Sequence, residues 1–96
     1  MMKTSSTEIQ RRVLISGRVQ GVGFRQSLFK EAEKVSVRGF VRNLKDGRVE
    51  AVFLGSPETV LKLTAWCKHG PALAKVSVLE VKEEPLDLSL GRLKIL

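Results

Sequence analysis

The sequence contains one cysteine, Cys67, and no tyrosine. A lone cysteine cannot form a disulfide within the chain, so we expect a protein of the reducing cytoplasm. The chain also lacks an apolar run of the roughly 20 residues that a membrane span needs. Its opening segment, MMKTSSTEIQRR, has no apolar stretch of the kind found in signal peptides. We therefore expect no membrane partner.

Aromatic residues are scarce, at 5% of the sequence, whereas lysine and arginine outnumber acidic residues by 17 to 10. The net charge of +7 favours an anionic partner, such as nucleic acid, an acidic surface or a small phosphate-bearing substrate. A solvated surface of scattered lysines and arginines would give the same excess. RNA-recognition modules stack bases on several strand aromatics, and the segment RGFVRN at 38–43 offers only Phe40. We therefore expect no nucleic-acid partner.

The length of 96 residues corresponds to one small domain with a single modest core. No internal repeat or interior linker divides the chain. Residues 1–7 are polar, and we expect them to form a flexible N-terminal tail ahead of a single domain over residues 8–96.

The spacing of apolar residues, together with the glycine, proline and serine residues that start or end helices and strands, predicts a definite order of elements. They are strands over 9–17, 37–43, 48–54 and 74–83, helices over 24–35 and 57–69, and a short edge strand over 92–96. A slip in the alternation between Val78 and Leu79 predicts a β-bulge in the fourth strand. This order is that of an α+β, ferredoxin-like split βαβ sandwich, an antiparallel sheet with two helices on one face. Because that fold hosts many unrelated functions, the site residues must decide the function.

The segment SGRVQGVGFRQ at 16–26 contains three glycines and two arginines but no acidic residue. It joins the first strand to the first helix, and Arg25 falls in the first helical turn, where an acidic residue would be more stable. Glycines let successive backbone N–H groups turn toward one point, and the helix N-terminus adds unpaired donors. The pattern is compatible with an anion site in which Arg25 binds two oxygens. A flexible turn with a surface arginine would fit this segment equally well.

Two better-known phosphate motifs are excluded. No Gly-Lys-Ser/Thr follows the loop, so it is not a nucleotide-binding P-loop. Gln26 stands where a dinucleotide fingerprint needs its third glycine.

Asn43 ends the second predicted strand, on the face that also carries Val41. Its neutral amide could hold a water molecule by both donating and accepting hydrogen bonds, or it could simply open the hairpin turn. Cys67 lies in an apolar helix stripe and His69 near a helix end, and neither position suggests chemistry. No residues show metal-ligand spacing, so we expect no metal.

The segments ISGRVQGVGFR (15–25) and GFVRNLKDGRVEAVFLG (39–55) resemble the two signature segments of the acylphosphatases. The resemblance extends through GPALAKVSVLEV and covers most of the chain in the family's order. It implies an enzyme without cofactor or metal that hydrolyses the carboxyl–phosphate bond of small acyl phosphates by direct attack of water. One departure is Ser36, where relatives commonly carry glycine; it would forgo a left-handed helix cap at a cost of about 1 kcal/mol.

The resemblance also implies roles for individual residues. The family's phosphate-binding arginine matches Arg25, and its water-holding asparagine matches Asn43. The phosphate cradle matches the backbone N–H groups of Gln20, Gly21, Val22, Gly23, Phe24 and Arg25. We expect a phosphate or sulfate ion to bind in this loop, and we expect a monomer.

Two other functions are open at this point. A binding module of the same fold would use its positive charge to hold RNA or another polyanion, with salt-sensitive affinity. A non-catalytic acylphosphatase-like domain, or one serving carbamoyl transfer in a hydrogenase-maturation protein, would carry the same motifs.

Overall fold

The computed structural model describes residues 7–96, so residues 1–6 of the expected tail lie outside the described residues. Both helices are shorter than predicted, because the last turn of each opens into irregular backbone before the next strand. The elements are β1 (Ile9–Arg18), α1 (Phe24–Glu33), β2 (Arg38–Asn43), β3 (Val49–Gly55), α2 (Pro57–Trp66), β4 (Lys75–Glu84) and β5 (Lys94–Ile95).

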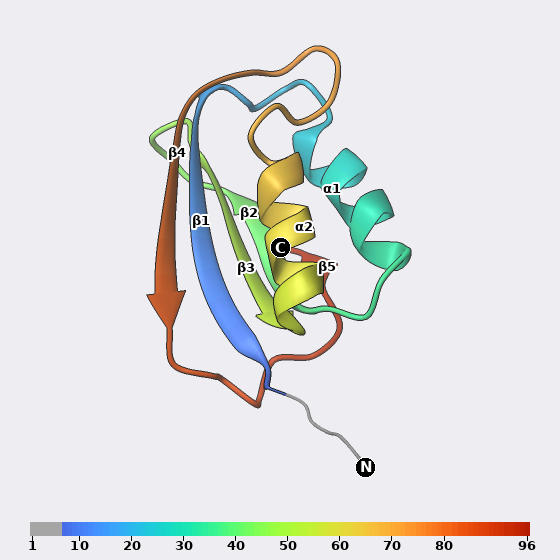
Figure 1. Ribbon diagram of the computed structural model, residues 1–96. Coiled ribbons are helices and arrows are strands. Elements are labelled where there is room, and N and C mark those ends of the chain that lie inside the picture. Colours follow the sequence, from blue (N-terminus) through green and yellow to red (C-terminus); the bar gives the residue numbers. More distant parts are fainter. Residues whose placement is uncertain (1–6) are drawn as a thin grey trace.

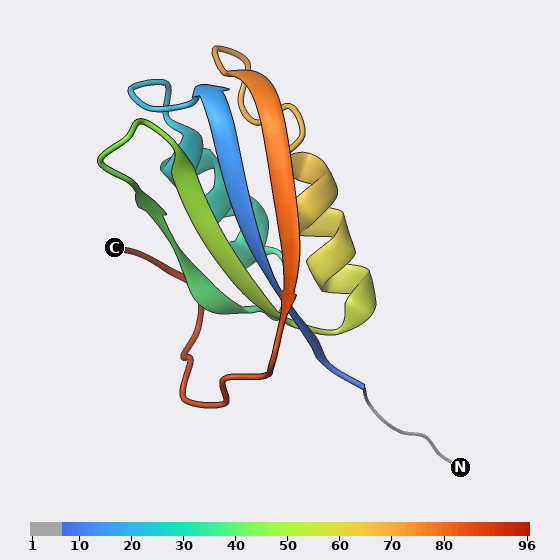
Figure 2. The ribbon, with the colours of Figure 1, turned by 90° about the vertical axis from the view of Figure 1, so that its left-hand side faces the viewer.

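The five strands form one sheet in the order β4-β1-β3-β2-β5. Neighbouring strands are antiparallel except for β5, which pairs with β2 in parallel. Both helices lie against the same face of the sheet and leave the other face without a helix (Figure 1 and Figure 2). This is the expected ferredoxin-like arrangement, with a short strand added at the β2 edge. No helix among residues 7–96 has the length and apolar composition needed to cross a membrane.

The core lies between the sheet and the helices because each contributes one apolar face. Phe24, Leu28 and Ala32 of α1 are buried at four-residue spacing, as the sequence pattern predicts. Val60 and Leu63 occupy the corresponding side of α2. The strands contribute a set of fully buried side chains at alternate positions: Val13, Ile15, Val41, Val49, Ala51 and Phe53.

The fourth strand contains a bulge, but it lies at Ser77 of β4 and not between Val78 and Leu79 as predicted. Ser16 pairs with Val78 and Gly17 with Val76, so Ser77 is an extra residue between two successive pairs. Gly17 has a φ of 124°, and a side chain there would overlap the backbone of β4. Glycine is therefore required where β1 approaches β4 just before the loop that follows β1.

The connection from α1 to β2 contains no left-handed residue. Within residues 7–96 only glycines have a positive φ, so Ser36 is not strained. Lys34 ends the helix in the right-handed conformation, and its N–H donates to the last helical carbonyls. The helix thus ends without the left-handed cap, as the serine predicts.

An ion-pair network crosses the face of the sheet that the helices leave uncovered. Glu50 of β3 accepts hydrogen bonds from Arg12 of β1 and Arg42 of β2, each at 2.6 Å. Arg12 also donates to Glu84 of β4. The Glu50 side chain is only 8% exposed, and this burial raises its pKa. The hydrogen bonds from Arg42 and Arg12 lower the pKa of Glu50 by more, so it lies below its ordinary value.

We expect Glu50→Gln to destabilise the protein at neutral pH by about 1–3 kcal/mol, because Arg12 and Arg42 each lose a charged partner, and only Arg12 keeps a second one in Glu84. The folded pKa of Glu50 is depressed. Its contribution is therefore complete above the unfolded-state pKa of about 4.3 and is lost as pH falls through the lower folded pKa. In urea unfolding, the difference between wild type and variant should shrink toward acid pH. Glu33→Gln, at an exposed glutamate outside the network, is the control. A difference that stays constant with pH would contradict this prediction.

The segments after β1 and after β2 meet at one end of the sheet, and the connection from β4 to β5 lies at the opposite end (Figure 2). The reason is chain direction. Because β1 and β2 both run antiparallel to β3, their carboxyl ends lie at the same end of the sheet. Asn43, the last residue of β2, therefore lies close to the loop that leads from β1 to Arg25.

Candidate active site

The loop between β1 and α1 turns through two left-handed glycines. Gly21 has a φ of 75° and Gly23 a φ of 78°, and Gly23 is the N-cap of α1. No side chain caps this helix, and its first turn contains no acidic residue. Within residues 7–96, the N–H groups of residues 20–25 donate to no backbone carbonyl. Unpaired donors and the positive end of the helix dipole are therefore available to an anion.

The loop forms one side of a small hollow of about 90 Å³. Arg25 and Asn43, which the sequence singles out separately, both line it. Of the six residues predicted for the phosphate cradle, only Val22 does not line the hollow; its side chain packs against the core instead. The complete lining is Val19, Gln20, Gly21, Gly23, Phe24, Arg25, Gln26 and Asn43.

Arg25 is the only ionisable residue that lines the hollow. Among the residues that the structure describes, no carboxylate lies within ion-pair distance of its guanidinium. Arg12 and Arg42, by contrast, are both bound to Glu50. The charge of Arg25 therefore lacks a partner within this part of the chain, which suits an anionic ligand.

The side chain of Gln20 connects the loop to the β2–β3 hairpin, a contact that the sequence analysis did not predict. Its Nε2 donates to the carbonyl oxygens of Leu44 at 2.8 Å and Arg48 at 2.9 Å. The hairpin is itself closed by the Leu44 N–H, which donates to the Arg48 carbonyl at 2.8 Å. Because Leu44 follows Asn43 directly, these contacts tie the position of Asn43 to the loop between β1 and α1. Its acceptors are backbone carbonyls, which every sequence has, so no residue pattern marks them.

We expect Gln20→Met to lower kcat about tenfold, because it keeps the side-chain length but removes both hydrogen bonds to the hairpin. Phosphate affinity should change less than kcat, since the backbone N–H of residue 20 is retained. Steady-state kinetics and phosphate calorimetry measure the two effects. Equal urea midpoints for variant and wild type would show that the fold is intact. An unchanged kcat would exclude this positioning role.

The ring of Phe24 anchors the start of α1 to the second helix. It contacts Trp66 edge-on, with ring centroids 5.4 Å apart and an interplanar angle of 72°. A side chain at Gly70 would overlap the Phe24 ring, so the turn after α2 also closes over it. The loop is thus supported from the core side, and its donors are held in place.

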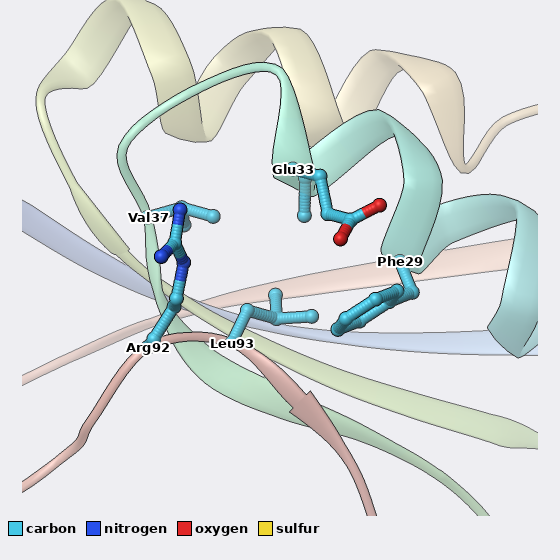
Figure 3. A pocket seen from close by; sticks show the side chains of 6 residues that line it. Phe29, Glu33, Val37, Arg92 and Leu93 are labelled. Carbon is cyan, nitrogen blue, oxygen red and sulfur yellow. The ribbon is translucent and has the colours of Figure 1, made fainter.

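Other candidate groups lie away from this hollow. Burial raises the pKa of the Cys67 thiol to about 12, so it is not a nucleophile at neutral pH. Within residues 7–96, no three metal-ligating side chains gather at one point. Figure 3 shows a larger hollow, of about 240 Å³, where Phe29 and Leu93 form the floor and Glu33 and Arg92 lie at the rim. It includes no residue of the loop between β1 and α1.

Comparison with known proteins identifies similar chains. A family model described as acylphosphatase matches residues 11–94. An acylphosphatase of Rubrobacter xylanophilus is 57% identical over 74 residues, which cover 77% of this chain and 67% of that relative. The solved structure of an acylphosphatase from Coxiella burnetii has a TM-score of 0.85 at 36% identity, covering 92% of each chain. HypF from T. kodakarensis gives a TM-score of 0.76 at 32% identity over 91% of this chain but only 11% of that one.

Proposed function

The chain belongs to the acylphosphatase family, and we propose that residues 20–25 bind the substrate phosphate while Asn43 holds the attacking water. The protein is an acylphosphatase, which hydrolyses the carboxyl–phosphate bond of small acyl phosphates to a carboxylate and inorganic phosphate. The observation that carries the proposed roles is the single hollow lined by the loop, Arg25 and Asn43.

The phosphate would be held by the loop donors and by Arg25 together. During phosphoryl transfer, charge spreads over the three equatorial oxygens of the group, and fixed donors aimed at these oxygens stabilise it. The unpaired N–H groups of the loop supply such donors, and the planar guanidinium of Arg25 can bind two oxygens at once. Inorganic phosphate or sulfate should bind in the same place, because it presents the same oxygens.

The leaving group explains why the hollow needs no acid. A departing carboxylate has a pKa of about 4, so it is stable at neutral pH without receiving a proton. Glutamine, asparagine and arginine are the polar side chains of the lining, so the residues that line the hollow include no carboxyl, imidazole or thiol group to serve as a general acid. The site is therefore suited to a substrate with a good leaving group rather than to an ordinary phosphate ester.

Asn43 would orient the water for in-line attack on phosphorus. Its amide oxygen can accept a hydrogen bond from the water and its amide nitrogen can donate one. A neutral amide is not a general base, so the proton of the water passes to a phosphate oxygen or to solvent. The contribution of Asn43 is then one of position, and the Gln20 contacts with the hairpin support it.

The binding-module alternative is not favoured. Phe40 is the only aromatic residue of β2, and the Arg42 guanidinium lies 5.8 Å from its ring centroid. The likeness to HypF means that this fold also occurs as a small part of a longer protein. The relatives named acylphosphatase match this chain over most of its length.

Hydrolysis of benzoyl phosphate, followed by ultraviolet absorbance, tests the proposed function. We expect turnover that EDTA does not reduce, with inorganic phosphate as a competitive inhibitor. No turnover, together with salt-sensitive oligonucleotide binding, would favour the binding module instead. The monomeric state and the cytoplasmic location stay predictions, which gel filtration and cell fractionation test.

A further inference from the structure

Another recess is lined by residues from α1, α2 and the turns that follow them; the two helices lie side by side against the sheet (Figure 1). We refer to it as the helix crevice; its volume is about 200 Å³. It shares no lining residue with the hollow that contains Arg25 and Asn43. The residues that line it are Glu31, Lys34, Val35, Lys62, Leu63, Ala65, Trp66 and His69.

The floor of the helix crevice is apolar. Leu63 is only 2% exposed, and Val35 and Trp66 are partly buried residues that pack against the core. The indole of Trp66 also contacts the His69 ring, with centroids 6.2 Å apart. A flat apolar group lying on the indole would bury surface from water on both partners, which is the main source of affinity in small-molecule sites.

The rim of the helix crevice is basic. Lys34 and Lys62 lie on opposite helices, and Glu31 is the only acidic residue of the lining. The Glu31 carboxylate is already paired with Lys34, at 3.1 Å. Lys62 has no carboxylate within ion-pair distance among residues 7–96. An apolar floor beneath a rim of net positive charge matches a ligand with an apolar body and one negative end.

We propose that the helix crevice binds small apolar monocarboxylates, with the hydrocarbon on Trp66 and the carboxylate directed to Lys62 and Lys34. The volume of the helix crevice suits a single ring or a short alkyl chain. An extended polyanion would not suit it, because its floor is apolar. Hydrolysis of an acyl phosphate releases a carboxylate, so this second site takes the chemical class of the reaction product. Trp66 touches Phe24, which lines the catalytic hollow, so the two sites are separated by one pair of rings.

Benzoate titration of the 96-residue chain tests the proposal, because Trp66 is its only tryptophan and reports directly on the helix crevice. We expect a saturable change in indole fluorescence, excited at the red edge of its band, and in the indole N–H signal by NMR. Lys62→Gln should weaken benzoate binding about threefold, which is the effect of losing one exposed ion pair. The double variant Lys34→Gln/Lys62→Gln should weaken it about tenfold. Lys68→Gln is the control: it removes a positive charge just after α2, from a residue that does not line the helix crevice, and should leave the affinity unchanged.

Benzoate bound in the catalytic hollow must be distinguished from benzoate bound at Trp66. The titration is therefore repeated in the Arg25→Ala variant and in saturating inorganic phosphate, where the indole response should persist. Benzyl alcohol and benzylamine, which keep the ring without the negative charge, should bind more weakly. The proposal is overturned by an unsaturable response, by equal affinities for the lysine variants and wild type, or by a response that disappears with phosphate.

Discussion

Arg25→Ala should lower kcat/KM for an acyl phosphate by at least about a thousandfold, because it removes the one cation that residues 7–96 place in the hollow where we propose that the phosphate binds. Phosphate binding should weaken sharply for the same reason. Stability should change little, since Arg25 has no ion-pair partner among residues 7–96 whose loss would leave a buried charge. Benzoyl phosphate kinetics and phosphate calorimetry measure the two functional effects.

Two further variants make the Arg25 result specific. Arg25→Lys keeps the charge but loses the planar fork, so its activity should lie between that of wild type and Arg25→Ala. Arg92→Ala removes an arginine from the larger hollow at the far end of α1 and should leave activity unchanged (Figure 3). If phosphate bound to Arg25→Ala as tightly as to wild type, the guanidinium would not hold the phosphate.

Asn43→Ala should lower kcat about a hundredfold or more while phosphate affinity stays near that of wild type, because the proposed role of the amide is to position the water and not the phosphate. The Asn43 side chain is exposed and makes no hydrogen bond to residues 7–96, so its removal should not unfold the protein. Single-turnover kinetics would place the loss in the chemical step. Calorimetry with phosphate would show whether binding is spared.

Asn43→Asp is the matched comparison for this prediction. It preserves the shape of the side chain but adds a negative charge to the hollow, so it should weaken phosphate binding as well as turnover. An Asn43→Ala variant in which turnover and phosphate affinity fell in parallel would mean that the amide contacts the phosphate and not the water.

The order of elements could be predicted because it depends on local patterns. The apolar faces of α1 and α2, the turn at Gly47 and the presence of a bulge in β4 all follow from spacing along the chain. The helix ends were less predictable. Val35 continues the apolar periodicity of α1, yet the helix ends at Glu33 because the chain must turn there toward β2. The parallel pairing of β5 with β2 depends on where the 85–92 connection ends, which no local pattern encodes.

The candidate site shows the same division. The acid-free glycine loop and Arg25 could be read directly, because a helix N-terminus with glycines before it has the same chemistry in any fold. The proximity of that loop to Asn43 could not be predicted from the sequence by such local patterns. The contact that Gln20 makes with Leu44 and Arg48 could not be predicted either. The acceptors in that contact are main-chain carbonyls, whose position depends on the whole sheet.

By itself, then, the sequence indicated which residues are candidates for the chemistry and which local structures hold them. Tertiary structure alone decided that two of these groups share one hollow, because β1 and β2 run in the same direction on either side of β3 and end at one edge. It also created the helix crevice, because α1 and α2 pack their apolar faces on the same side of the sheet and bring Trp66, Lys34 and Lys62 to one recess. Both are consequences of chain direction and packing, which arise only between segments distant in sequence.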